Sequence, residues 1–407
     1  METYFAVTAP GLEAFTAQEL HGLLSNHEPS TVPDGINRED AKAAKPSGES
    51  EENLRTLPPF DVQPEPGGVI FKGDLSTLYR ANLYLRTASR ILARLGNFFR
   101  ATTFPELQER LTRLPWERFI TPGQPVSMRV TCHKSRLYHS DAVLRCAAAA
   151  LAERLGQDSP IHKTDEGSEQ PSQLVVIRLS EDYCTVSVDS SGRLLHKRGY
   201  RQAVAKAPLR ETLAAAVLMA SGWDRRAPLI DPFCGSGTIP IEAALMALGI
   251  PPGIQRLFAF MDWPGYDESL WQKTAGSWQK MESNPPPIMA SDRDAGAIEM
   301  AQANAERAGV TDMIEFKCQA VSSIAPPLEP GWMVTNPPYG LRISEGKDLR
   351  NLYAQFGNVL RAKCPRWNLA VLSSDPGLLG QLHIKLDMSL SLVNGGIRVR
   401  LGRGIVK

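Results

Sequence analysis

Four consecutive residues, Asn336, Pro337, Pro338 and Tyr339, have the groups needed to hold a planar ligand that carries an NH2. They follow a short apolar run at 332–334, so they mark the exit from a buried strand into a loop. Neither proline has an N–H, which leaves carbonyl oxygens unpaired. The asparagine oxygen and a proline carbonyl accept two amino hydrogens, while the tyrosine ring stacks on the ligand face. A proline turn with a buried tyrosine fits equally well, so the rest of the chain decides.

A glycine-containing turn at 231–238, D-P-F-C-G-S-G-T, is a second place for chemistry. It follows a short apolar run at 229–230 and precedes an apolar segment at 239–248. This is the strand–turn–helix unit that begins a doubly wound sheet, in which ligands bind at the carboxyl end of the strand. Glycines let the backbone approach a ligand closely, and the helix N-terminus favours a carboxylate or phosphate.

The segments after this turn alternate between strand and helix patterns. Residues 288–292 form a strand pattern that ends in Asp292, the position where such sheets hold ribose hydroxyls, whereas Asp294 fits a helix cap equally well. The remaining patterns are a helix at 295–308, strands at 313–318, 332–335 and 369–373, and a final hairpin with an Asn-Gly turn at 389–399. We interpret 249–287 as irregular. A parallel sheet that ends in an antiparallel hairpin differs from a dehydrogenase-type nucleotide fold.

Two short basic clusters lie outside these motifs. The first lies between a strand pattern at 126–130 and a helix pattern from residue 140, and consists of His133, Lys134, Ser135 and Arg136. The second consists of Lys197, Arg198, Tyr200 and Arg201. Cationic and hydroxyl side chains suit phosphate oxygens, and a tyrosine among basic residues suits a stacked base. The alternatives are a solvated loop for the first cluster and a charged hinge between domains for the second.

Composition limits the function classes. A chain of 407 residues predicts two or three domains, and Lys+Arg 45 against Asp+Glu 44 requires any nucleic-acid affinity to come from local patches. The six cysteines lack C-x-x-C spacing, which argues against a structural metal site and disulfides. No apolar run approaches the length of a membrane span, and the N-terminus lacks a signal-peptide pattern. We therefore expect a cytoplasmic protein with no metal and no membrane partner.

The N-terminal region alternates strand and helix patterns around one compositional break. Strands at 4–8 and 67–71, a helix at 11–24 and an Asp74-capped helix together predict a small α+β, ferredoxin-like unit. Residues 25–66 contain seven prolines and few apolar side chains. Too little of this segment can be buried to offset its chain entropy, so we expect a mobile insertion.

These motifs together resemble the class I S-adenosylmethionine-dependent methyltransferases, in which N-P-P-Y marks enzymes that methylate amino groups. Three further stretches resemble the THUMP-domain RNA methyltransferases, specifically the bacterial branch that makes N2-methylguanosine in large-subunit ribosomal RNA: T-A-P-G-L-E at 8–13, V-T-C-H-K-S-R-L-Y-H at 130–139 and K-R-G-Y-R at 197–201. The resemblance covers nearly the whole chain except 25–66. It implies a ferredoxin-like unit at 1–72, with about 102 as the alternative boundary, a THUMP domain at 73–190, and a Rossmann-like α/β methyltransferase domain at 191–407 with a mostly parallel seven-stranded sheet.

The resemblance also implies roles for single residues. S-adenosylmethionine would be held by Asp231, Phe233, Gly235, Gly237, Thr238, Asp292 and Asn336. The target guanine would be held by Asn336, Pro337, Pro338 and Tyr339, and structured RNA by the two basic clusters. Two positions depart from the family pattern, because Ala320 and Leu341 stand where the family usually has acids. The rival interpretations are a transfer-RNA guanine-N2 enzyme, a DNA adenine enzyme, and a non-catalytic RNA-binding or ribosome assembly factor that keeps the fold.

Overall fold

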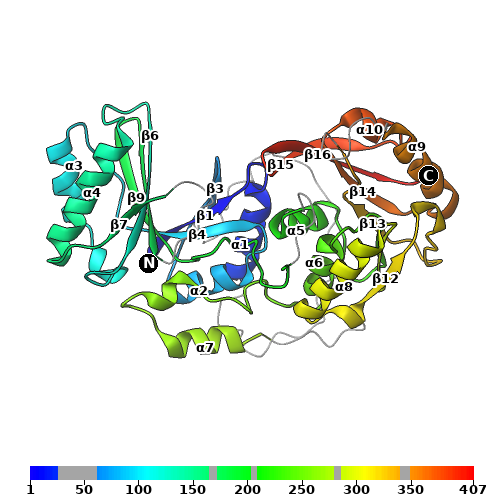
Figure 1. Ribbon diagram of the computed structural model, residues 1–407, viewed down its shortest axis with the longest axis horizontal. Helices are drawn as coiled ribbons and strands as arrows, with labels where there is room; N and C mark the ends of the chain where they lie inside the picture. Colours follow the sequence, from blue (N-terminus) through cyan, green and yellow to red (C-terminus); the bar gives the residue numbers. More distant parts are fainter. Residues whose placement is uncertain (26–61, 165–171, 203–208, 279–285, 340–348) are drawn as a thin grey trace, which may run out of the picture.

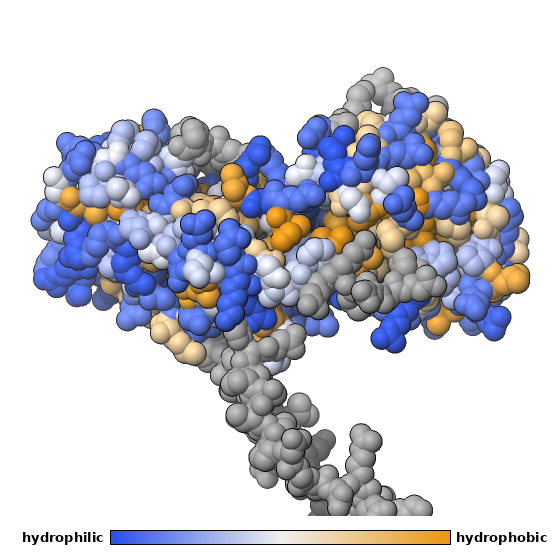
Figure 2. Space-filling model, turned by 90° about the horizontal axis from the view of Figure 1, so that it is seen from below, coloured by the Kyte–Doolittle hydropathy of each residue, from blue (hydrophilic) through white to orange (hydrophobic). Residues whose placement is uncertain are grey.

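The structure is a computed structural model, which describes residues 1–25, 62–164, 172–202, 209–278, 286–339 and 349–407. Two sheets organise these residues into two lobes (Figure 1). Seen from below, the left lobe is mostly hydrophilic, and hydrophobic residues gather along the waist between the lobes (Figure 2).

The first sheet has nine strands in the order β2-β3-β1-β4-β9-β8-β6-β7, with β5 paired to β9. Its strands are β1 (Glu2–Thr8), β2 (Val62–Glu65), β3 (Gly68–Gly73), β4 (Ala88–Arg94), β5 (Phe99–Arg100), β6 (Val126–His133), β7 (Ile161–Lys163), β8 (Gln173–Ser180) and β9 (Tyr183–Asp189). Its helices are α1 (Glu13–Ser25), α2 (Leu75–Tyr84), α3 (Phe104–Thr112) and α4 (Ser140–Leu155), with the 3-10 turn η1 (Trp116–Arg118). Antiparallel pairing of β4 with β9 makes one continuous sheet of the expected ferredoxin-like and THUMP parts. The boundaries at 72 and 190 stay predictions.

The predicted insertion at 25–66 is wrong at its C-terminal end. Residues 62–65 form β2, which pairs antiparallel with β3 from Val62 opposite Phe71 to Glu65 opposite Gly68. β2 is the edge strand of the sheet, the position in which a sheet accepts a proline such as Pro64. Residues 26–61 lie outside the described residues.

The second sheet has seven strands in the order β12-β11-β10-β13-β14-β16-β15. Its strands are β10 (Leu229–Asp231), β11 (Ile288–Asp292), β12 (Ile314–Cys318), β13 (Trp332–Thr335), β14 (Asn368–Ser373), β15 (Asp387–Asn394) and β16 (Ile397–Ile405). Its helices are α5 (Glu211–Ala220), α6 (Thr238–Ala247), α8 (Ala295–Ala308), α9 (Arg350–Lys363) and α10 (Pro376–Gly380), with 3-10 turns η3 (Thr311–Met313) and η4 (Val321–Ser323). Between α6 and β11 the chain also forms the 3-10 turn η2 (Ala259–Asp262) and helix α7 (Glu268–Gly276), which pack against the first lobe. β10 to β14 pair in parallel and β16 pairs antiparallel to β14, which confirms the predicted sheet with its terminal hairpin.

Helix α7 corrects the interpretation of 249–287 as irregular. Asp267 caps its N-terminus by accepting a hydrogen bond from the Leu270 N–H at 2.9 Å. Trp271 and Thr274 are buried one turn apart, and the Trp271 ring packs edge-on against Tyr79 of α2. The helix is therefore held by packing on the first lobe, a long-range contact that the surrounding proline-rich sequence does not reveal.

The two lobes meet at the β15–β16 hairpin, which extends from the second sheet toward the loop between β1 and α1 (Figure 1). Leu12, in that loop, is fully buried in the same hydrophobic cluster as Leu392 of β15. A side chain at Gly11 would place its Cβ 2.5 Å from the Ser391 carbonyl oxygen, so only glycine permits this approach.

Candidate active site

The N-P-P-Y sequence lies where β13 ends, beside the end of β10 in the middle of the second sheet. The Oδ1 atom of Asn336 is buried and has no hydrogen-bond partner among the described residues. A buried acceptor without a partner costs stability unless a ligand supplies the donor. This amide oxygen is therefore suited to an amino group that enters the site from outside the protein.

Two side chains from other elements fix the loop after Asn336. The Tyr353 hydroxyl, on α9, donates to the Pro338 carbonyl oxygen at 3.3 Å. The side-chain amide nitrogen Nδ2 of Asn394, at the end of β15, donates to the Tyr339 hydroxyl oxygen at 3.1 Å. Neither Tyr353 nor Asn394 was predicted as a site residue, because only the folded sheet brings them to this loop.

Asp231 ends β10 and is almost fully buried. Its carboxylate accepts hydrogen bonds from the Thr335 hydroxyl at 2.6 Å and from the Phe233 N–H at 3.2 Å. Burial raises the pKa of Asp231 to about 7. The two hydrogen-bond donors lower the pKa only in part, the charge of Asp292 raises it further, and no cation among the described residues offsets the burial. A buried carboxylate without a counter-charge is suited to the ammonium group of a ligand.

The glycine turn is shaped by two residues in the left-handed region, Gly235 with φ 51° and Gly237 with φ 82°. A Cβ on Gly237 would lie 3.0 Å from the Ala301 Cβ, so helix α6 packs closely on α8. The side chain of Asn304, buried on α8, donates to the Ser236 carbonyl oxygen at 3.0 Å and holds the turn in place. Thr238 is the first residue of α6 and is buried, whereas Phe233 is partly buried.

Asp292, at the end of β11, joins this turn to the neighbouring strand. One carboxylate oxygen accepts from the Gly235 N–H at 3.0 Å, and the other accepts from the Asp294 N–H at 3.0 Å. Asp294 caps α8 by accepting from the Gly296 N–H at 2.9 Å, so the cap alternative holds for Asp294. The structure thus brings Asp231, Asp292 and Asn336 to adjacent strand ends, as a doubly wound sheet requires.

Comparisons with known proteins decide the family. Three family models match: the RlmL ferredoxin-like domain at 50–92, the THUMP domain at 101–189, and the RMKL-like methyltransferase domain at 198–397. A Synechocystis protein provisionally named an RNA methyltransferase is 31% identical over 97% of this chain and 94% of its own. The chain belongs to the THUMP-domain RNA methyltransferases.

Two further relatives bear on substrate and cofactor. The ribosomal RNA large subunit methyltransferase K/L of Methylococcus capsulatus is 35% identical over 82% of this chain and 46% of its own. The crystal structure of SMU.472, a methyltransferase by its provisional name, was solved with SAH and superposes with a TM-score of 0.81, at 28% identity over 100% of this chain and 98% of that one. This RNA methyltransferase uses S-adenosylmethionine, and its substrate is RNA.

The residues at the strand ends fit that cofactor. The buried Asp231 carboxylate suits the ammonium of the methionine part, and a Cβ on Gly235 would meet nothing within 4 Å, so the backbone of the turn is open to a ligand there. The family often has an acid where Ala320 stands; here Ala320 is exposed and precedes η4. Leu341, the second departure, lies outside the described residues.

The first basic cluster of this methyltransferase forms an exposed turn at the end of β6. The side chains of His133, Lys134 and Arg136 are exposed, and Lys134 adopts φ 47°. The Ser135 hydroxyl donates to the His133 carbonyl oxygen at 3.0 Å, and the Arg136 N–H donates to Asp182 at 2.8 Å. The backbone of the turn is thereby fixed while its three cationic or titratable side chains face solvent.

Two exposed aromatic residues near this turn were not predicted. Phe98 and Tyr183 are 67% and 48% exposed, with ring centroids 5.8 Å apart in an edge-on arrangement. Arg100, which pairs with Tyr183 across β5 and β9, lies 3.9 Å from the Asp182 carboxylate. We call residues 98–100, 133–136 and 182–183 the THUMP tip. The sequence pattern did not identify Phe98 and Tyr183 as exposed, because the exposure of a single ring depends on the fold around it.

The second basic cluster is not an exposed surface, which corrects the expectation that it contacts RNA. Arg198 and Tyr200 are buried, with 3% and 2% of their surface exposed. The Tyr200 hydroxyl donates to buried Glu242 of α6 at 3.1 Å, and the Arg198 guanidinium lies 3.6 Å from the same carboxylate. Arg201 pairs with Glu211 at 3.1 Å, and only Lys197 has an exposed side chain. The hinge alternative describes this cluster better.

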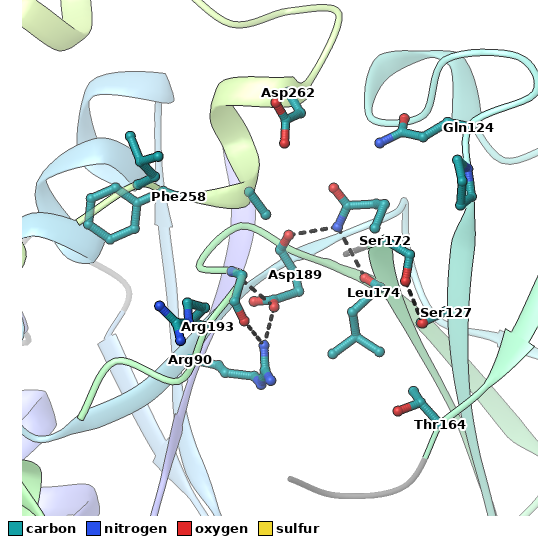
Figure 3. Close-up of a pocket in the computed structure, with 15 residues that line it drawn as sticks. Arg90, Gln124, Ser127, Thr164, Ser172, Leu174, Asp189, Arg193, Phe258 and Asp262 are labelled. Carbon is teal, nitrogen blue, oxygen red and sulfur yellow. Dashed lines mark hydrogen bonds and ion pairs between the residues drawn. The ribbon is translucent and has the colours of Figure 1, made fainter. Parts of the chain in front are cut away.

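A cavity of about 490 Å³ lies away from the N-P-P-Y loop, where the first sheet meets the segment 257–262 (Figure 3). An ion pair between Arg90 and Asp189 lies on one side, and a 2.6 Å hydrogen bond joins Ser127 and Ser172 on the other. Because these polar side chains bond one another, we interpret the cavity as a gap in the packing between elements and not as a ligand site.

The described residues give no sign of two other site types. They contain no group of three His, Cys, Asp or Glu side chains placed to hold a metal ion. Within the same ranges, no helix has both the length and the apolar character needed to cross a membrane.

Proposed function

We propose that this methyltransferase transfers a methyl group to the exocyclic N2 amino group of a guanosine in large-subunit ribosomal RNA. The observation that carries the proposal is the buried Asn336 Oδ1 without a partner at the end of β13. The resemblance of the chain to the guanine-N2 branch supports the choice of base. The name of the Methylococcus relative, a large-subunit ribosomal RNA methyltransferase, supports the choice of RNA.

The guanine amino group is a poor nucleophile, because its lone pair is delocalised into the ring. Asn336 Oδ1 and the Pro337 carbonyl oxygen accept its two hydrogens, which returns electron density to nitrogen and aims the lone pair. Tyr339 stacks on the ring of the unpaired or flipped base, with Pro338 completing the loop. S-adenosylmethionine supplies a methyl group on a positively charged sulfur, an excellent leaving group. Positioning then supplies as much as roughly 7–11 kcal/mol. As the N–C bond forms, the methyl–sulfur bond breaks and S-adenosylhomocysteine leaves, and the amino proton then passes to water.

The cofactor side of the proposal assigns one group to each strand end. Asp231 faces the ammonium, Asp292 the ribose hydroxyls, and Asn336 lies between cofactor and base. Phe233, Gly235, Gly237 and Thr238 shape the turn that surrounds the methionine part. The support is the adjacency of β10, β11 and β13 in the sheet and the uncompensated Asp231 carboxylate.

For RNA binding, we propose the THUMP tip as the surface that grips the substrate, with His133, Lys134, Ser135 and Arg136 on phosphates. Phe98 and Tyr183 add faces on which unpaired bases stack, the combination used for single-stranded RNA. Support comes from the exposure of these side chains and from the THUMP family match.

The test of the mechanism is Asn336→Ala, compared with Asn351→Ala on the exposed surface of α9. The Asn336 variant is expected to lose methyl transfer by about three orders of magnitude or more while S-adenosylmethionine affinity changes less than about tenfold, because one contact of many is lost. The Asn351 variant is expected to behave as the unmodified protein. Transfer by the Asn336 variant at the unmodified rate would refute the mechanism.

A further inference from the structure

We propose that the β15–β16 hairpin transmits the placement of the N-terminal lobe to the base-stacking tyrosine, with Asn394 as the positioning residue for Tyr339. The inference rests on the proposed stacking role of Tyr339 and adds a residue and a route to it. Asn394 lies 55 positions from Tyr339 in sequence and belongs to a different element.

The first observation is the fixed geometry of Asn394. Only 5% of its surface is exposed, and its amide nitrogen donates to the Tyr339 hydroxyl at 3.1 Å. Asn394 pairs with Ile397 across a two-residue turn, in which Gly395 has φ 56° and Gly396 has φ 83°. Positive φ at both turn residues gives the tight hairpin connection that matches strand twist. The donor is therefore held by the hairpin backbone as well as by its burial.

The second observation is that the same strand contacts the N-terminal lobe. Leu392, two residues before Asn394, is fully buried in one cluster with Leu12. A Cβ on Gly11 would lie 2.5 Å from the Ser391 carbonyl oxygen and 3.3 Å from the Leu392 side chain. The loop between β1 and α1 therefore touches the hairpin directly, as Figure 1 shows.

Together these contacts form a short physical route from the RNA-gripping lobe to the reacting base. A shift of the loop at Gly11 displaces β15, and Asn394 passes that displacement to the Tyr339 hydroxyl. Because Tyr339 sets the plane of the stacked base, it also sets the line between the amino nitrogen and the methyl group. A misplacement of about 1 Å costs on the order of 100-fold in rate.

The test at Asn394 compares Asn394→Ala, Tyr339→Phe and the double variant. Tyr339→Phe keeps the ring and removes only the hydroxyl, so both single variants lose the same hydrogen bond. Each is expected to lower kcat for RNA about 3- to 10-fold with KM for RNA and for S-adenosylmethionine within about twofold, and the double variant to be no worse than either. Unchanged kcat, additive losses, or a loss confined to KM would overturn the proposal.

The test at the other end uses Gly11→Ala, with Gly67→Ala as its matched control. Both glycines have positive φ, at 92° and 88°, and both donate their N–H to the Glu13 carboxylate, but a Cβ on Gly67 would meet nothing within 4 Å. The backbone strain of the two substitutions is therefore similar, and only the Cβ of Gly11→Ala would clash with the hairpin. Gly11→Ala is expected to lower kcat beyond Gly67→Ala by at least threefold, and equal effects would overturn the route. The readout is a ratio of rates on whichever RNA accepts the methyl group, so it stays interpretable if the guanine assignment fails.

Discussion

Glu242 of α6 is the buried centre of the junction between the lobes, and its removal has a calculable cost. The carboxylate has no exposed surface and lies 3.6 Å from the Arg198 guanidinium and 3.8 Å from that of Arg86. Arg86, which is 11% exposed, also donates to the Ile250 carbonyl oxygen at 2.5 Å, just after α6 ends. Glu242→Ala removes the carboxylate that lies between these two guanidinium groups, and breaking a buried ion pair in this way costs about 3–5 kcal/mol.

The assay for this prediction is thermal unfolding. For a domain of about 150–250 residues, each kcal/mol shifts Tm by roughly 2–4 °C, so Glu242→Ala is expected to lower Tm by about 6–20 °C. Glu242→Gln keeps an acceptor for the Tyr200 hydroxyl and is expected to lose less. Glu299→Ala, on the exposed face of α8, is the control with no expected change. A Glu242→Ala shift below about 2 °C would refute the assignment of this junction as a buried charge network.

Two further predictions concern pH and RNA. Because the pKa of Asp231 is raised to about 7, its carboxylate becomes ionised as pH rises toward 7, and affinity for cationic S-adenosylmethionine is expected to rise with it between pH 5.5 and 7. Calorimetric titration checks this, and Asp231→Asn is expected to bind weakly with no such pH dependence. An equal change of affinity with pH in the variant and the unmodified protein would contradict the prediction. Phe98→Ala and Tyr183→Ala are each expected to weaken RNA binding about 5- to 150-fold, since a base–aromatic stack contributes about 1–3 kcal/mol. Phe104→Ala, an exposed phenylalanine on α3, is the control in the filter-binding assay, and an equal loss there would contradict a specific stacking role.

The catalytic half could be predicted from sequence because its signals are local. The glycine turn, the acid after the next strand and the N-P-P-Y loop each lie within a few residues, and the sheet order then places them together. Asp74 illustrates the same point in the first lobe: its predicted cap forms, with the Thr77 N–H donating to it at 2.8 Å.

What the sequence could not show depends on partners far along the chain. Arg198 and Tyr200 were expected to face RNA, yet both are buried against Glu242, more than forty positions later. A charge cluster has the same composition on a surface and in a junction, and only the tertiary partner separates the two. The hydrogen bond from Asn394 to Tyr339 and the edge-on contact of the Phe98 and Tyr183 rings likewise depend on tertiary neighbours that local patterns do not encode.

The most direct test of the central claim is methyl transfer from labelled S-adenosylmethionine to separate pools of unmodified ribosomal and transfer RNA, followed by nucleoside analysis. We predict N2-methylguanosine in the large-subunit ribosomal RNA and none after Asn336→Ala. Label in transfer RNA alone would contradict the proposed substrate, and a methylated base other than N2-methylguanosine would contradict the proposed atom. No label in either pool, together with no S-adenosylmethionine binding, would contradict the assignment of an active methyltransferase.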